Sequence, residues 1–195
     1  MPITDTLETP VFLIAMKQVV DPFFHRSVVL LLEHDEGGSF GMIVNRPTDV
    51  SMLDLLAGLG VTWAGALDAP SWFGGPVQPG VGTVLYGAEE PAEEGEDVSH
   101  EIEGGLHISR DIRVLTRLAA APPSELRLFL GYAGWGPGQL SQEIERNDWL
   151  VAPFDRASLF DDDPAGMWGR ALESIGVRPE SLPNWTMTAD DEKAN

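Results

Sequence analysis

The sequence predicts a single domain of the α+β class. Predicted strands outnumber predicted helices, the strands cluster early in the chain, and no regular strand–helix–strand repeat indicates a parallel sheet. The chain has 195 residues, of which 43% are hydrophobic, so it can bury the core of one domain of ordinary size.

The predicted strands are short apolar or β-branched segments that are bounded by turn residues. A buried strand is expected at residues 11–15, and Pro22 ends the segment that follows it because proline fixes φ. Residues 27–33 and 39–45 flank the turn residues Gly37 and Gly38, which predicts a hairpin. Further strands are expected at residues 71–73, 82–86, 106–109, 126–130 and 149–151.

Capping residues mark the ends of the predicted helices. Ser51 is followed three residues later by Asp54, a pattern that resembles a capping box at a helix start. The last helix is expected to have Asp163 as its N-cap and Pro164 in its first turn, and to end at Gly176. Two more helices are expected at residues 110–120 and 138–147.

Acidic residues dominate the charge of the chain. It has 12 Lys and Arg residues against 31 Asp and Glu residues, and 12 − 31 = −19. This charge weighs against binding to nucleic acid or to anionic membranes, because both need basic residues to displace counterions. Eight of the acids lie at residues 89–103 without a Lys or Arg, which predicts a solvated loop, and the polar tail at 188–195 is expected to fray.

Several classes of site are excluded or not indicated. The chain has no cysteine, so it has no disulfide, thiol nucleophile or iron–sulfur cluster. No metal site and no cofactor are predicted. Residues 33–36, which are three acids and a histidine, would alternate between the faces of a strand and cannot all converge on one ion. The acids at 161–163 precede a helix and are expected to cap it. The start of the chain lacks a signal-peptide pattern, and no apolar run approaches the ~20 residues of a membrane span, so a cytoplasmic protein without a membrane partner is expected.

Several motifs follow one another in a fixed order along most of the chain: AM (15–16), DPF (21–23), SVVLL (27–31), EH (33–34), GMIVNRP (41–47), GGPV (74–77), GYAGWGPGQL (131–140), EI (143–144) and NDWL (147–150). In these motifs and in their order, the chain resembles the YqgE/AlgH family of bacterial proteins. The resemblance covers residues 11–182. It implies a bifurcated, mostly antiparallel sheet curled into a pseudo-barrel with flanking helices. It also implies a family without an established biochemical activity, some of whose members carry a transcriptional-regulator label.

Two glycine-rich segments suggest catalysis or anion binding, and each has a structural interpretation. Residues 37–41 match G-x-S-x-G, but a nucleophile elbow needs a helix after the serine and here an apolar strand segment follows, so a hairpin turn is preferred. Residues 131–138 are expected to form a loop before a helix. Such a loop can hold a phosphate or carboxylate, although its glycine spacing is not that of a dinucleotide site.

No catalytic residue is predicted, and the candidate ligand-binding residues come from three segments. Arg46 ends a strand and can pair with a carboxylate in the fold or in a ligand, while Gln139 and Glu143 share one face of a short helix. The full set is Asn45, Arg46, Gly74, Gly75, Gly134, Trp135, Gln139 and Glu143.

The sequence therefore favours a non-enzymatic binding or regulatory protein whose partner is an unidentified protein or small molecule. One alternative is a metal-assisted hydrolase that uses Asp or Glu at a glycine-lined pocket. Another is a transcriptional regulator that contacts DNA directly, which the net charge of −19 and the small stripe of Arg110, Arg113 and Arg117 disfavour. The oligomeric state is not indicated.

Overall fold

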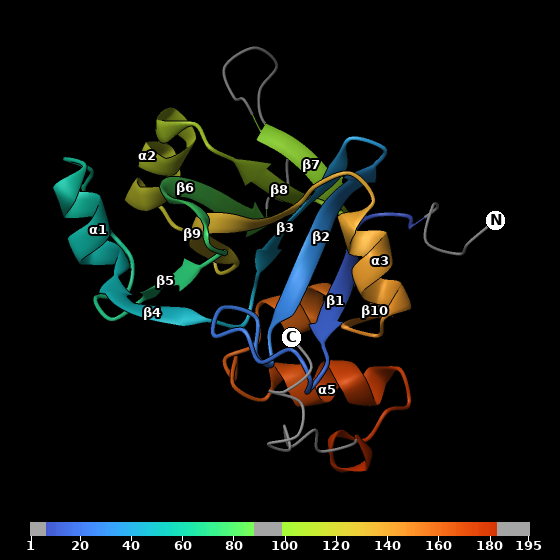
Figure 1. Cartoon of the computed structure of the whole chain (residues 1–195). Helices are drawn as coiled ribbons and strands as arrows, with labels where there is room; N and C mark the ends of the chain where they lie inside the picture. Colours follow the sequence, from blue (N-terminus) through green and yellow to red (C-terminus); the bar gives the residue numbers. More distant parts are fainter. Residues whose placement is uncertain (1–6, 88–98, 183–195) are drawn as a thin grey trace.

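A strongly curled sheet that forks at one long strand, β9 (Leu126–Trp135), organises the molecule (Figure 1). The computed structural model describes residues 7–87 and 99–182, and this part of the chain holds ten strands in one sheet. The other strands are β1 (Val11–Ala15), β2 (Val28–Asp35), β3 (Gly38–Ile43), β4 (Pro47–Ser51), β5 (Pro70–Phe73), β6 (Val77–Gly87), β7 (Ser99–Glu103), β8 (Leu106–Ser109) and β10 (Trp149–Pro153).

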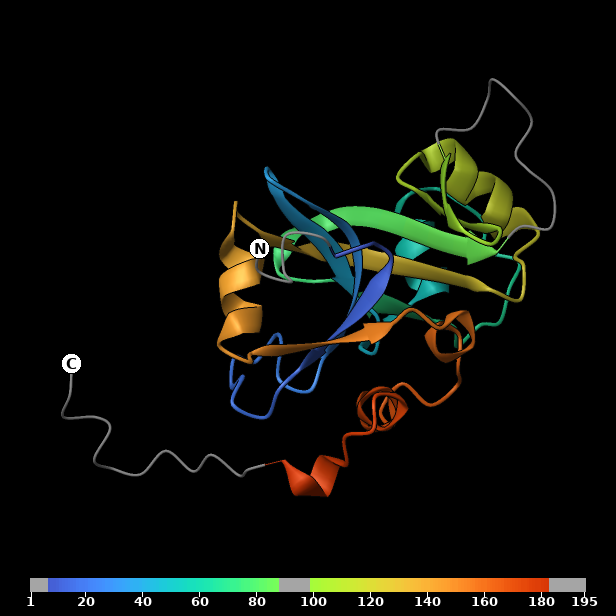
Figure 2. The ribbon, with the colours of Figure 1, turned by 90° about the vertical axis from the view of Figure 1, so that its right-hand side faces the viewer.

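The strand order is β10-β1-β2-β3-β9-β6-β8-β7, and β5 joins β9 off this path while pairing with β4. Neighbouring strands are antiparallel except for β5 and β9, which are parallel. The two arms of the sheet curl toward each other as a half-barrel (Figure 2). The predicted α+β class and the curled, mostly antiparallel sheet are therefore confirmed.

The fork arises because the two ends of β9 pair with different strands. Residues 133–135 pair with β3, whereas residues 126–132 pair with β6. At the junction, the amide of Gly74 donates to the carbonyl of Leu130 at 2.8 Å, and the carbonyl of Gly74 accepts from the amide of Ile43 at 2.8 Å. A Cβ on Gly75 would lie 2.2 Å from the carbonyl carbon of Tyr132, so only glycine permits this approach.

Helices cover both arms and bury three apolar clusters. Helix α5 (Met167–Ser174) packs its Trp168 and Leu172 into the interior of the half-barrel, and α3 (Gln139–Glu145) covers the opposite face of β1, β2 and β3. Helices α1 (Met52–Gly58) and α2 (Ile112–Ala120) pack against β6 and β9. The short helices α4 (Arg156–Leu159) and η2 (Pro179–Ser181) complete the described elements.

Several local predictions are confirmed. The hairpin is formed by β2 and β3, and the Ser51 hydroxyl caps α1 by accepting from the amide of Asp54 at 3.0 Å. Gly176 follows the last helix with a φ of 77°, as a helix-terminating glycine requires.

Three predictions are wrong. Residues 99–103 of the expected acidic loop form β7, because they pair with β8, while residues 88–98 and the tail at 188–195 lie outside the described residues. Residues 131–135 of the expected glycine-rich loop continue β9, since β3 and β6 both offer it partners. The last helix has Gly166 as its N-cap rather than Asp163, whose carboxylate accepts from the amide of Gly166 in the preceding turn.

We expect Gly75→Ala to lower the free energy of unfolding by about 2–3 kcal/mol, because Gly75 has a φ of 150° and its Cβ would overlap the backbone of Tyr132. Urea unfolding followed by tryptophan fluorescence measures this change. Gly80→Ala is the matched control: nothing lies within 4 Å of its Cβ, so we expect a change within about 0.5 kcal/mol. Equal stability of the two variants would contradict the close approach at the fork.

Candidate functional site

Asn45 and Arg46 serve the fold rather than an open pocket. The Asn45 side chain accepts from the amide of Val28 at 2.9 Å and donates to the carbonyl of Arg26 at 3.0 Å. Arg46 donates to the carbonyls of Pro22 at 2.8 Å and His25 at 2.6 Å. Arg46 therefore binds backbone carbonyls of the turn after β1, and burial lowers the pKa of its guanidinium while nearby Asp21 partly offsets this.

Four of the eight predicted residues lie together beside α3. Gly134, Trp135, Gln139 and Glu143 line a pocket of about 330 Å³ that also includes Phe24 and Trp149. Asn45, Arg46, Gly74 and Gly75 are not among the residues that line it. The predicted set therefore divides into three groups. Gly134, Trp135, Gln139 and Glu143 line the pocket, Asn45 and Arg46 bind the loop after β1, and Gly74 and Gly75 lie at the fork of the sheet.

The Glu143 carboxylate is the centre of this pocket wall. Its Oε2 accepts from the indole N–H groups of Trp135 and Trp149, both at 2.8 Å, and its Oε1 accepts from the Gln139 amide at 2.8 Å. The two indole rings pack edge to face with centroids 5.8 Å apart. Glu143 is thus engaged in holding two buried indoles, an arrangement that suits a structural role better than proton transfer.

The G-x-S-x-G segment has a serine–histidine contact without the geometry of a nucleophile elbow. The Ser39 hydroxyl lies 2.8 Å from Nδ1 of His34, its cross-strand neighbour in the hairpin. Ser39 also pairs with Trp135 on the other side, so the hydroxyl lies within a sheet. An elbow would place the serine on a sharp turn between a strand and a helix. Within residues 7–87 and 99–182, no three His, Asp or Glu side chains are grouped as metal ligands would be.

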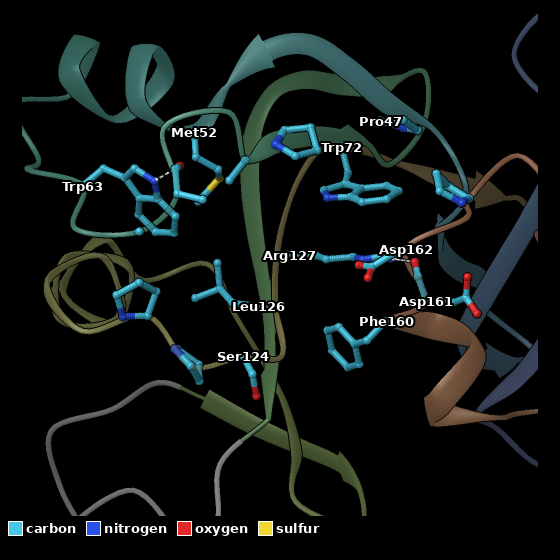
Figure 3. A pocket seen from close by; sticks show the side chains of 17 residues that line it. Pro47, Met52, Trp63, Trp72, Ser124, Leu126, Arg127, Phe160, Asp161 and Asp162 are labelled. Atoms are coloured by element: carbon cyan, nitrogen blue, oxygen red, sulfur yellow. Dashed lines mark hydrogen bonds between the residues drawn. The ribbon is translucent and has the colours of Figure 1, made fainter.

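The cavity with the most distinctive electrostatics surrounds Arg127, a residue that the sequence did not single out (Figure 3). It has a volume of about 500 Å³ and lies between β5, β9 and the segment before α5. In Figure 3, Arg127 extends between the rings of Trp72 and Phe160 toward two aspartates. The opposite side is apolar and is formed by Met52, Trp63 and Leu126 together with several prolines.

Arg127 is almost fully buried, with 6% of its surface exposed. Its guanidinium carbon lies 3.7 Å from the centre of the Trp72 ring, and its two Nη groups donate to the carbonyls of Val44 and Asp161, both at 2.9 Å. Burial lowers the pKa of Arg127 to about 10, an effect that the charges of Asp161 and Asp162 partly offset. The arginine thereby ties the segment before α5 to the sheet.

Helices that could cross a membrane are absent from the described segments: none is both long and apolar enough.

Comparison with known proteins identifies the family. The family model described as AlgH-like (DUF179) matches residues 12–180, which is most of the chain. The chain belongs to the AlgH-like family. The resemblance to the YqgE/AlgH family that the motifs indicated is therefore confirmed.

AlgH-like relatives match at nearly full length. A UPF0301 protein of Paracoccus denitrificans is 43% identical over 173 residues, which cover 87% of this chain and 90% of that protein. A UPF0301 protein of Myxococcus xanthus is 39% identical over 175 residues, covering 89% and 93% of the two chains.

Two solved structures share the fold. The solution structure of the AlgH protein from Pseudomonas aeruginosa superposes with a TM-score of 0.71 at 33% identity, covering 94% of this chain and all of that one. A crystal structure of a protein from Corynebacterium diphtheriae gives a TM-score of 0.69 at 26% identity, with 91% of each chain covered.

We expect Glu143→Ala to destabilise this AlgH-like protein by about 2–4 kcal/mol, because it leaves the indole N–H groups of Trp135 and Trp149 without their acceptor. Chemical denaturation measures the loss, and both indole N–H signals should move in a ¹H–¹⁵N spectrum. Glu145→Ala changes an exposed residue of the same helix and is expected to alter stability by less than about 0.5 kcal/mol. An unaltered pair of indole signals in Glu143→Ala would refute the role of this carboxylate.

Proposed function

We propose that this AlgH-like protein is a non-enzymatic, cytoplasmic binding protein and that the cavity beside Arg127 is its ligand site. The observation that supports the proposal is the construction of that cavity: apolar and aromatic walls end at a buried arginine whose pKa is lowered to about 10. Ligand sites are typically concave and mostly apolar, with a few fixed polar groups and perturbed pKa values.

The polar end of the cavity favours a ligand with a hydrogen-bond donor. The two Nη groups of Arg127 are engaged with backbone carbonyls, and one Asp161 oxygen lies 3.1 Å from Arg170. Asp162 lines the same cavity at an exposed position, and within the described ranges its carboxylate has no hydrogen-bond partner closer than 3.5 Å. A small molecule with an apolar body and an amine or amide group therefore complements this cavity best.

A regulatory role would act through this binding rather than through direct contact with DNA. The net charge of −19 opposes a phosphate backbone. In the described part of the chain, Arg113, Arg146, Arg156 and Arg170 are already ion-paired with Asp or Glu side chains. Binding of an uncharged or cationic ligand meets no such opposition.

A fragment screen by ¹H–¹⁵N NMR tests the proposal. We expect apolar amines or amides to shift the indole N–H signals of Trp63 and Trp72, which line the cavity. Ala66→Trp places a ring at an exposed lining position and should weaken binding about tenfold or more, because it fills the space.

Ala57→Trp is the matched control, since it adds the same ring at an exposed position of α1 outside the lining. The bound compound should be recovered chemically unchanged after prolonged incubation. A screen without shifts at Trp63 and Trp72, equal weakening by both variants, or conversion of the compound would each contradict the proposal.

A further inference from the structure

A third pocket, a groove of about 670 Å³, lies at the mouth of the half-barrel, where the β2–β3 hairpin faces β7 and β8 (Figure 1). None of the residues that line the Arg127 cavity lines this groove. Open ends of β-barrels are frequent ligand sites because strands from several parts of the chain converge there. Its lining residues are Glu33, Phe40, His100, Ile108, Ser109, Arg110, Asp111 and Tyr132.

An aromatic shelf holds Arg110 in place within the groove. Phe40 and Tyr132 pack with ring centroids 5.1 Å apart, and the guanidinium carbon of Arg110 lies 5.1 Å and 5.5 Å from these two rings. Its Nε–H donates to the buried hydroxyl of Thr83 at 3.2 Å. The guanidinium is thus oriented before any ligand arrives, which reduces the entropic cost of binding.

Among the described residues, Arg110 lacks the carboxylate partner that four other arginines have. Arg113, Arg146, Arg156 and Arg170 each lie within ion-pair distance of an Asp or Glu. In the segments the structure describes, no carboxylate is within 4.0 Å of Arg110, and its Nε–H alone has a hydrogen-bond partner. Arg110 therefore differs from Arg113, its neighbour on the same stripe, whose guanidinium is paired with Asp111.

We propose that this groove binds a small organic monocarboxylate with a flat apolar body. The carboxylate would accept two N–H groups from the Nη atoms of Arg110, since a guanidinium matches this planar, bidentate geometry. The apolar body would lie against Phe40, Ile108 and Tyr132, which already line the groove.

The acidic residues around the groove favour a ligand with one negative charge over a ligand with two. Glu33 of β2 lines the same groove and lies opposite Phe40 of β3 in the strand pairing. Asp111 lines it too, paired with Arg113. These acids and the net charge of −19 oppose a dianion such as a phosphate monoester more strongly than a carboxylate.

Titration calorimetry and ¹H–¹⁵N NMR with three probes test this assignment. We expect 2-naphthoate to bind and to shift the amides of Phe40, Ile108 and Tyr132 while the indole signals of Trp63 and Trp72 stay in place. The uncharged 2-naphthalenemethanol should bind at least about tenfold more weakly, because it cannot form charge-assisted hydrogen bonds with Arg110. The dianionic 2-naphthyl phosphate should also bind more weakly than the carboxylate.

Variants of α2 and its flank complete the test. Arg110→Gln should weaken 2-naphthoate binding about tenfold or more, and Arg110→Lys should fall between it and the wild type because lysine keeps the charge without the planar fork. Arg117→Gln removes the same charge from the same region outside the groove lining and should leave affinity unchanged. Unchanged Trp135 and Trp149 indole signals establish that each variant is folded.

Four results would overturn the proposal. The first three are the absence of shifts at the groove, equal affinity for the alcohol and the carboxylate, and unchanged affinity in both Arg110 variants. The fourth is tighter binding of the phosphate, which would reject the monocarboxylate class. Because the shifted amides belong to the groove and not to the Arg127 cavity, failure here leaves the proposed function separately testable.

Discussion

The close approach of two glycine-containing backbones at the fork of the sheet is the constraint on which the structure depends. A Cβ on Gly74, the residue after β5, would lie 2.3 Å from the carbonyl oxygen of Gly131 in β9, and a Cβ on Gly131 would lie 2.3 Å from the carbonyl oxygen of Gly75. The two backbones can therefore approach this closely only where these residues are glycines. The hydrogen bonds of Gly74 to Leu130 and to Ile43 then connect both arms of the sheet at one point. Separation of the arms would break the pairing of β9 with β3 or with β6.

The same strand supplies a residue to each of the three pockets. Arg127, near the start of β9, lines the Arg127 cavity, whereas Tyr132 lines the groove at the mouth of the half-barrel. Trp135, at the end of the strand, joins the indole–carboxylate cluster of Glu143. A rigid, doubly paired strand therefore fixes the relative positions of these pockets, and preorganised sites of this kind bind with less loss of entropy.

Local signals in the sequence predicted local structure well, and distant partners account for the failures. The β2–β3 hairpin and the Ser51 cap depend on neighbours a few residues away, and both are confirmed. Residues 131–135 have the composition of a loop, yet they form a strand because β3 and β6 lie beside them. The eight candidate site residues were selected from local motifs. Helical spacing correctly placed Gln139 and Glu143 together, but no local motif could show that Arg127 reaches Val44, 83 residues away.

The central claim is that the fork makes both arms of the sheet one cooperative unit, and native-state hydrogen exchange tests it most directly. Amides of β2 in one arm and of β6 in the other should exchange with the same free energy of opening, equal to that of global unfolding. The amides of Gly74 and Ile43, which bond across the fork, should share that value. An opening free energy for the β6–β8 arm that is several kcal/mol below that of the β1–β3 arm would contradict the account.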